Sequence, residues 1–307
     1  MGERLGGGQV GVSARSSYWR GFALPGVFWL CLFVVIPAYA VIAMAFGTEN
    51  ILLQPVPAWN PLTWNPGWVS KAFSGALPGG EYWPAIRNTL VYVTAALALC
   101  FAIGYPVAYY VARHAPKRWK PLLVILLVIP FWVSYLLRML AWIGLLSSDG
   151  YVNKLLIDLG IAHPPDWLNG NAYSVIIALV YGYIPYFILP LYASLDRIDR
   201  SYLEAARDLG ASPSRAFWHV TLPLSKTGLL GGLVLIALPM FGEYYTPNMV
   251  SSAPTTSMFG NQIDLYFHGG PQPTIGAALT IVLSVFLVVL MGYYMLSIHR
   301  ASKELTQ

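Results

Sequence analysis

The sequence predicts an all-α membrane protein with six transmembrane helices. Of its 307 residues, 57% are hydrophobic and only 10% are charged, whereas about 25% of a soluble domain is charged. A surface with so few ionisable groups must face lipid over most of its area, and the mean hydropathy of +0.58 agrees with this. The apolar residues also gather into long runs, and a helix needs about 20 such residues to cross a bilayer.

Six runs meet that length, and each is interpreted as one membrane helix. The first is too long for a signal-peptide core and has no cleavage pattern after it, so we expect it to be retained. A disordered tail, 1–22, then precedes one transmembrane domain, 23–299, and a short tail, 300–307, follows it. The predicted helices span residues 23–47, 86–112, 121–146, 172–193, 227–249 and 274–298.

The distribution of lysine and arginine predicts that both termini face the cytoplasm, since cytoplasmic loops of membrane proteins are enriched in these residues. The outer segments hold only Lys71 and Lys154, with Arg87 at the mouth of the second helix. The net charge of +5 is therefore attributed to topology and not to nucleic-acid binding. The inner segments hold Arg4, Arg15, Arg20, Arg113, Lys117, Arg118, Lys120, Arg197, Arg200, Arg207, Arg215, Lys226, Arg300 and Lys303.

Several kinds of chemical site are excluded by the sequence. Cys31 and Cys100 lie inside apolar runs and the five histidines are scattered, so neither a disulfide framework nor a metal site is expected. A G-x-G-x-x-G pattern in the N-terminal tail follows no strand and opens no βαβ unit, so it is discounted as a dinucleotide site. No P-loop motif is present, so ATP binding by such a motif is excluded.

The long outer segment 48–85 is rich in Pro, Trp and Asn. We expect it to be an ordered loop at the membrane interface.

The loop at 194–226 concentrates the charge that the rest of the chain lacks. Ser201 followed by Glu204 fits a capping box, and Gly210 stands where helices end in the left-handed conformation. Ser212 and Pro213 then fit the cap and first position of a second helix. The loop is thus predicted to hold a short helix, a sharp turn and a second amphipathic helix. From these local signals alone, it could equally be a solvated cytoplasmic loop with no partner.

The same loop resembles the EAA loop of the permease subunits of ATP-binding-cassette (ABC) importers, whose pattern is EAA-x3-G-x9-I-x-LP. Residues 204–223 match every fixed position except that Val220 stands for Ile. The resemblance implies that the first short helix is a coupling helix seated on a separate ATPase dimer, with ATP and Mg bound there and no cofactor in this chain. It implies a non-catalytic permease in a bacterial cell membrane. The coupling contacts would come from Glu204, Ala205, Ala206 and Gly210.

Two charged residues, Arg138 and Glu243, fall inside predicted membrane helices, where a charge costs about 2.5–3.5 kcal/mol on insertion scales. One interpretation is a structural ion pair between them, or snorkelling to the outer interface. The other places them on a substrate path, where a carboxylate and aromatic faces suit an ammonium ligand. The aromatic residues included in that path are Tyr135, Trp142, Tyr244 and Tyr245.

Residues 130–156 and 242–250 resemble the spermidine/putrescine branch of these permeases, as do Gly260, Asn261 and the segment 276–279. The resemblance implies a polyamine substrate, a second homologous permease forming a heterodimer, and an extracytoplasmic binding protein. An importer for another small solute stays open. So do an ion-driven secondary transporter, which explains the six helices but not the EAA spacing, and a scaffold that transports nothing.

Overall fold

The computed structural model describes residues 24–51, 54–161, 165–269 and 272–304, with side chains described as far as residue 297. The tail predicted at 1–22, with the glycine pattern of Gly6, Gly8 and Gly11, lies outside these residues. Helices make up nearly all of the described chain. Its only strands are the short antiparallel pair β1 (Thr48–Glu49) and β2 (Pro55–Val56).

Five helices of the described chain are long and apolar enough to cross a membrane, and a pair bent by 90° makes a sixth when it is counted as one span. The predicted all-α membrane fold is confirmed, while the orientation of the termini stays a prediction. The first crossing is Leu24–Ala45, which contains the π turn η1 (Cys31–Val35) and α2 (Ile36–Ala45). The others are α4 (Trp83–Arg113), α8 (Ala172–Asp196), the run α10 (Pro213–Ala216), η4 (Phe217–Thr221) and α11 (Leu222–Phe241), and α14 (Pro273–Glu304). Helix α14 thus continues through residues 300–304, where a tail was expected.

The third predicted helix, 121–146, is not continuous. It consists of α5 (Lys120–Val128), the 3-10 turn η3 (Ile129–Trp132) and α6 (Tyr135–Leu146), and the direction of the chain changes by 90° between them. Val133 is extended and Ser134 also has a non-helical ψ of 141°, which interrupts the helical hydrogen bonds between η3 and α6. Apolar length alone predicted one span because it carries no information about this break.

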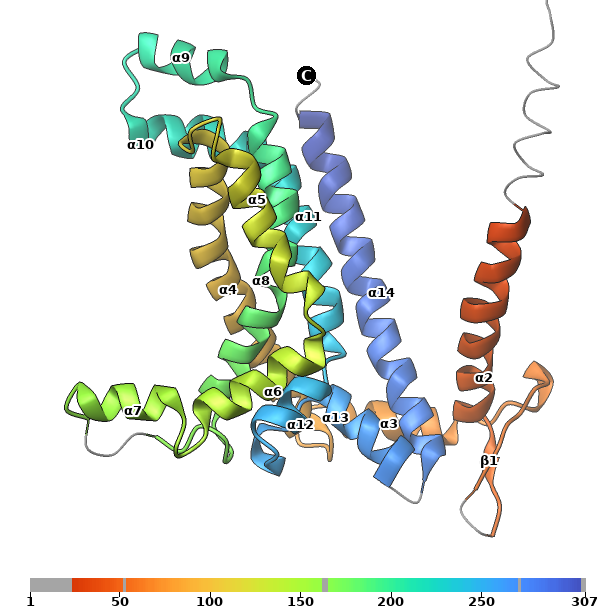
Figure 1. Cartoon of the computed structure of the whole chain (residues 1–307). Coiled ribbons are helices and arrows are strands. Elements are labelled where there is room, and N and C mark those ends of the chain that lie inside the picture. The colour runs from red at the N-terminus through yellow and green to blue at the C-terminus, as the bar shows by residue number, and fades with distance from the viewer. Residues whose placement is uncertain (1–23, 52–53, 162–164, 270–271, 305–307) are drawn as a thin grey trace, which may run out of the picture.

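The remaining elements are short and connect the spans. Figure 1 shows α9 projecting from one end of the molecule, where α14 also ends, and α3, α7 and α12 at the other end. We call these the α9 end and the α12 end. The connecting elements are η2 (Pro61–Thr63), α3 (Gly67–Ala76), α7 (Tyr151–Asp158), α9 (Arg200–Asp208), α12 (Tyr245–Val250), η5 (Pro254–Thr256), α13 (Phe259–Asp264) and η6 (Leu265–Gly269).

The core of the bundle lies where α8 packs between α4 and α11. Phe187 of α8 is fully buried there, against glycines of both neighbours. A Cβ on Gly104 would lie 2.7 Å from the Phe187 ring, and one on Gly232 would lie 3.1 Å from it. Because lipid is as apolar as these side chains, close packing and not escape from water holds membrane helices together, and small residues permit it.

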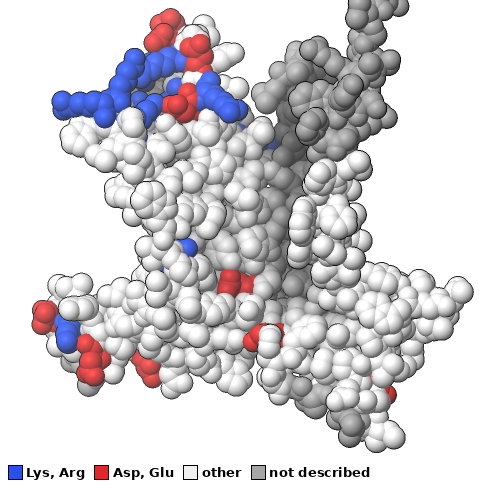
Figure 2. Space-filling view, turned by 45° about the vertical axis from the view of Figure 1, so that its right-hand side comes forward, with Lys and Arg blue, Asp and Glu red and all other residues white. Residues whose placement is uncertain are grey.

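The first helix stands apart from this core. Its apolar window is only 6% buried, and it approaches α14 and α3 mainly near its end, where Ala43 and Ala45 are buried (Figure 1). In Figure 2 the charged side chains gather at the α9 end, with a second, smaller group at the α12 end, and the wall between them is almost entirely uncharged. An uncharged band between two charged ends is the distribution that a lipid bilayer requires.

Candidate functional site

Two breaks in the long helices hold the predicted functional residues, and the first is the loop around α9. Its N-terminal cap is Asp199, whose Oδ1 accepts a hydrogen bond from the Ser201 amide at 3.0 Å. The predicted capping box, with Ser201 as the cap, is wrong: Asp199 is the extended residue and the helix begins at Arg200, so Ser201 already lies inside it. The hydrogen bond from the Ser201 amide lowers the pKa of the Asp199 carboxyl below its usual 3.8.

The C-terminal end of α9 follows the prediction. Gly210 has φ +80°, and the amides of Gly210 and Ala211 donate to the carbonyls of Arg207 and Ala206 at 2.8 and 3.0 Å. Two crossed hydrogen bonds of this kind close a helix with a residue in the left-handed conformation. The next helix begins two residues later, with Ser212 as its cap at 3.4 Å from the Arg215 amide and a proline at its first position.

Helix α9 has no buried residue. Glu204, Ala205 and Gly210 are exposed, Ala206 is half-buried, and Leu209 is 89% exposed. A helix this exposed gains nothing from burial within this chain, so its stability rests on its caps. Of the four predicted coupling residues, three are therefore exposed, two on the projecting helix α9 and one in the turn that follows it (Figure 1).

The loop is firmly attached to the membrane helices beneath it. The chain runs without interruption from α10 through η4 into α11, so the second short helix is the beginning of a membrane span. The ring of Phe217 packs edge-on against Tyr105 and Tyr109 of α4, with centroids 5.6 Å away in each case. Lys120 at the start of α5 forms an ion pair of 2.5 Å with Asp196 at the end of α8. The loop is therefore in contact with α4 and continuous with α8 and α11.

The second break lies at the α12 end and carries Glu243. The helix predicted at 227–249 stops at Phe241, and a new helix, α12, begins at Tyr245. The turn Gly242–Tyr244 between them we call the Glu243 turn. Pro247 falls in the first turn of α12, where its missing N–H leaves no hydrogen bond unmade. Non-helical backbone inside a membrane protein is tolerated where protein buries it or where it lines a cavity.

The Glu243 carboxylate is held by three hydrogen bonds and is only 8% exposed. The Tyr183 hydroxyl donates to Oε2 at 2.6 Å, while the amide and hydroxyl of Thr246 donate to Oε1 at 3.0 and 3.2 Å. The hydroxyl of Tyr135 also bonds to that of Thr246. Three donors from two helices therefore fix the direction in which this carboxylate points.

Arg138 does not supply a cation to this carboxylate. In the described chain neither Arg138 nor Glu243 belongs to an ion pair, so the structural pair considered from the sequence is not formed. The guanidinium lies over the ring of Tyr135, 5.4 Å from its centroid, and its buried Nε has no hydrogen-bond partner among the described residues. The 90° bend before α6 accounts for the difference, since it changes where every residue after Ser134 points.

Glu243 lines a cavity of about 560 Å³ bounded by α6, α8, α11 and α12. Four of the six predicted path residues lie on its wall, namely Tyr135, Glu243, Tyr244 and Tyr245. Arg138 and Trp142 do not, and Trp142 instead packs against Tyr181 with centroids 5.3 Å apart. The lining residues are Tyr135, Gly182, Tyr183, Tyr186, Leu235, Pro239, Gly242, Glu243, Tyr244 and Tyr245.

Sequence reasoning missed the contribution of α8, above all Tyr183 and Tyr186. Both occur in an aromatic stretch of a predicted membrane helix that contains no charged residue. Aromatic residues alone are a weak indication of a binding site in a membrane helix. Gly182 shapes the same wall, because a Cβ there would lie 2.7 Å from the Tyr135 ring. A solitary carboxylate among five tyrosines can attract an organic cation. No group of three or more His, Cys, Asp or Glu that could hold a metal occurs in the described part of the chain.

Comparison with known proteins agrees with this geometry. Residues 85–303 match the family described as binding-protein-dependent transport system inner membrane component. The chain belongs to this family. Family membership confirms the prediction of a non-catalytic ABC importer permease in the inner membrane, which carries its substrate across without converting it.

Individual relatives cover most of the chain. The spermidine/putrescine transport system permease protein PotB of Haemophilus influenzae is 34% identical over 91% of this chain and 92% of its own length. PotB of Escherichia coli K12 is 32% identical over 91% and 96%. Both relatives are thus similar to this chain over nearly all of its length and of their own.

Solved structures support the fold at lower identity. A chain of a bacterial ABC transporter that imports the polysaccharide alginate superposes with a TM-score of 0.69 and 17% identity, over 94% of this chain and 96% of that one. A chain of the MetNI methionine ABC transporter gives a TM-score of 0.53 and 17% identity, over 71% and 94%. At these identities the similarity concerns the fold alone.

Proposed function

We propose that this chain is one of two permease subunits of an importer for an organic polycation of the polyamine class, such as spermidine or putrescine. The observation that carries the substrate class is the Glu243 carboxylate, which lines a tyrosine-walled cavity and forms no ion pair within the described residues. A carboxylate and aromatic faces both attract an ammonium group. The names of the PotB relatives support the same class.

The α9 end is proposed to face the cytoplasm and to bind the ATPase. A capped, exposed helix with no buried residue is suited to docking on another protein, and Glu204, Ala205, Ala206 and Gly210 would make the contacts. ATP and Mg bind to the ATPase, and its closure would move α9 and with it α4, α8 and α11. Alternating access of the cavity to the two sides of the bilayer then follows as a rigid-body motion.

A second, homologous permease and an extracytoplasmic binding protein complete the proposed assembly. The apolar first helix supports this assembly, because its window is only 6% buried within this chain and its apolar surface is free to pack against helices of another subunit. We propose a heterodimer. Purification of the complex tests this, since two copies of this chain with no second kind of permease would show a homodimer.

Replacement of Glu243 tests the substrate class. In cells that express the complete transporter, Glu243→Gln should raise the KM for labelled spermidine by about tenfold or more. Interactions with a charged group contribute about 1.5–3 kcal/mol, and 1.4 kcal/mol is a factor of ten. The Gln side chain keeps an oxygen for the Thr246 amide, so the fold should be retained.

Glu81→Gln is the matched control, because Glu81 is an exposed carboxylate at the same end of the molecule and does not line the cavity. It should leave KM unchanged. An unchanged KM in Glu243→Gln, or efficient import of an uncharged solute that spermidine does not inhibit, would contradict a polycation importer.

Replacement of Glu204 tests the coupling proposal. Glu204→Ala should abolish uptake together with substrate-stimulated ATP hydrolysis, while the complex still binds its substrate-binding protein. Uptake that survives an inactivated ATPase but collapses with the membrane potential would show an ion-driven transporter instead.

A further inference from the structure

The Glu243 turn rests directly on helix α13. A Cβ on Gly260 would lie 2.6 Å from the Glu243 carbonyl oxygen and 2.7 Å from that of Gly242. Backbone atoms cannot withdraw as a flexible side chain can, so only glycine permits this approach. The position of α13 therefore sets the position of the turn.

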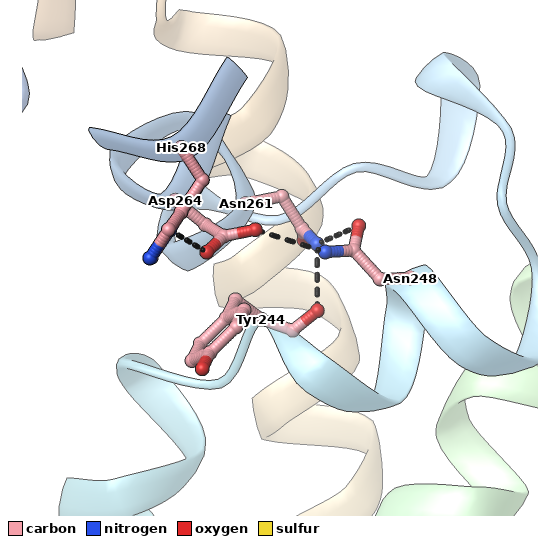
Figure 3. A network of polar contacts seen from close by, with 5 residues as sticks. All are labelled: Tyr244, Asn248, Asn261, Asp264 and His268. Carbon is pink, nitrogen blue, oxygen red and sulfur yellow. Dashed lines mark hydrogen bonds and ion pairs between the residues drawn. The ribbon is translucent and has the colours of Figure 1, made fainter. Parts of the chain in front are cut away.

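Asn261, the next residue, ties α13 to both sides of the turn (Figure 3). Its Nδ2 donates to the Tyr244 carbonyl and to Asn248 Oδ1, both at 2.7 Å, and its Oδ1 accepts from the Met258 amide at 2.8 Å. The side chain is 8% exposed and does not line the Glu243 cavity. Asn261 thus contacts the backbone that presents Tyr244 and Tyr245, and not the cavity itself.

Helix α13 is in turn anchored on α4. The Phe259 amide donates to Thr89 Oγ1 at 2.7 Å, and Asn88 Nδ2 donates to the carbonyls of Thr255 and Ser257 at 2.9 and 3.0 Å. Because α4 packs along α8, these bonds connect the Glu243 turn to the helix that carries Tyr183. Tyr183 in turn bonds the Glu243 carboxylate at 2.6 Å, so the turn is tied to α8 directly and through α13 and α4.

The Met258 amide and the Tyr244 carbonyl require this orientation of the Asn261 amide, and a chain of hydrogen bonds from the surface reinforces it. Asp264 lies near the surface, where Oδ1 contacts His268 Nδ1 at 2.9 Å and Oδ2 accepts from Asn248 Nδ2 at 3.3 Å. An ionised carboxylate only accepts hydrogen bonds, so Asn248 must turn its oxygen toward Asn261. Asn261 must then direct its Nδ2 to Asn248 and Tyr244, as Figure 3 shows.

We infer that Asn261 is a positioning residue for substrate recognition: through the Tyr244 carbonyl it holds the Glu243 carboxylate in place against Tyr183 and toward the cavity. Asp264 and Asn248 reinforce the orientation of the Asn261 amide from the surface. The inference rests on the proposed role of Glu243 in binding the substrate.

The test measures KM and Vmax of spermidine uptake separately in each single variant. A double-mutant cycle with Glu243→Gln then shows whether the two effects are independent. Asn261→Ala should raise the KM for spermidine uptake by about tenfold and change Vmax by less than about threefold. If Asn261 acts through Glu243, adding Asn261→Ala to Glu243→Gln should raise KM no further. The carboxylate that Asn261 positions is already absent from the Glu243→Gln variant, so the two effects should not add. A merely structural role would lower the amount of assembled transporter and leave KM unchanged.

Asn153→Ala is the matched control. Asn153 is 6% exposed and also makes three hydrogen bonds: its Nδ2 donates to the Ser147 and Ser148 carbonyls, and its Oδ1 accepts from Trp167. It lies on α7 and does not line the Glu243 cavity. Its loss should lower thermal stability as Asn261→Ala does, while KM stays unchanged.

A surface variant keeps the inference testable if Asn261→Ala fails to fold. Asp264→Asn removes the acceptor-only group and should raise KM about two- to threefold, again only where Glu243 is present. An effect of Asn261→Ala or Asp264→Asn that multiplies with that of Glu243→Gln would overturn the inference. An unchanged KM in Glu243→Gln would instead overturn the proposed function.

Discussion

The loop around α9 and the Glu243 turn are both short interruptions between long helices, but different contacts hold them. The α9 loop is closed by neighbours in sequence, since Asp199 caps through the Ser201 amide and Gly210 bonds back to Arg207. The Glu243 turn has a local partner in Thr246, but it is also held by residues far away in sequence. Tyr183 stands 60 positions before Glu243, and Asn261 stands 17 positions after Tyr244.

This difference follows from what each region must do. A helix that docks on another protein has to stay exposed, so it cannot use burial and must be stabilised by its own caps. A carboxylate that binds a ligand inside a membrane protein has to be desolvated, and several helices must then supply its donors. Substitutions in the α9 loop should therefore act locally, and those around the Glu243 turn should act on the whole bundle.

The largest effect is expected from Gly260→Ala. The new methyl would meet the carbonyls of the Glu243 turn, and overpacking of this kind costs about 1–3 kcal/mol. Thermal unfolding in detergent should show a clear loss of stability, and the KM for uptake should rise. Gly144→Ala is the control, because no atom lies within 4 Å of the added Cβ. Equal stability of the two variants would contradict the close contact.

A smaller loss is expected from Thr89→Val, which keeps the side-chain shape but removes the acceptor for the Phe259 amide. A buried donor left unpaired costs about 1–3 kcal/mol. The thermal midpoint should fall, although no cavity residue has changed. Thr280→Val removes a hydroxyl that bonds only within its own helix, to the Gly276 carbonyl, and should be nearly neutral. A neutral Thr89→Val would show that α13 is not anchored on α4 by this bond.

Gly210→Ala should affect α9 alone. At φ +80° an L-residue is strained by about 1–2 kcal/mol, and no neighbouring atom lies within 4 Å of the added methyl. We expect faster hydrogen exchange in α9 and weaker stimulation of ATP hydrolysis, with an unchanged thermal midpoint of the bundle. Gly292→Ala, in equally open space at an ordinary φ, is the control. A lowered midpoint in Gly210→Ala would show that the loop is not a local unit.

The smallest effect is a pH dependence at Asp199. The hydrogen bond from Ser201 lowers its pKa, so the ionised carboxylate stabilises the start of α9. This stabilisation is fully present above the unfolded pKa of about 3.9 and is lost as the pH falls through the still lower folded value. Asp199→Asn keeps a capping oxygen without titrating. Amide exchange of α9 should match in the two proteins at pH 6 and diverge below pH about 4; parallel profiles would refute the cap.

The sequence alone predicted what depends on nearest neighbours and on apolar length. It predicted the membrane class and the crossings other than the bent one. It also predicted that α9 ends at a left-handed Gly210 and that Ser212 and Pro213 begin the next helix. It placed the α9 cap two residues too late, because Asp199 and Ser201 are both good caps and only the backbone conformation selects between them. The charged residue Glu243 was found because a carboxylate is rare in an apolar run.

Only the tertiary structure decided how the Glu243 site is built. After the 90° bend before α6, Arg138 lies over the Tyr135 ring and forms no ion pair with Glu243, while Tyr135 lies on the cavity wall. Tyr183 enters from α8, and Asn261 holds the turn from α13. Apolar periodicity records which residues avoid water, but it does not record which helices meet. Partners that lie far apart in the chain are therefore fixed by packing and by the need of buried polar groups for hydrogen bonds.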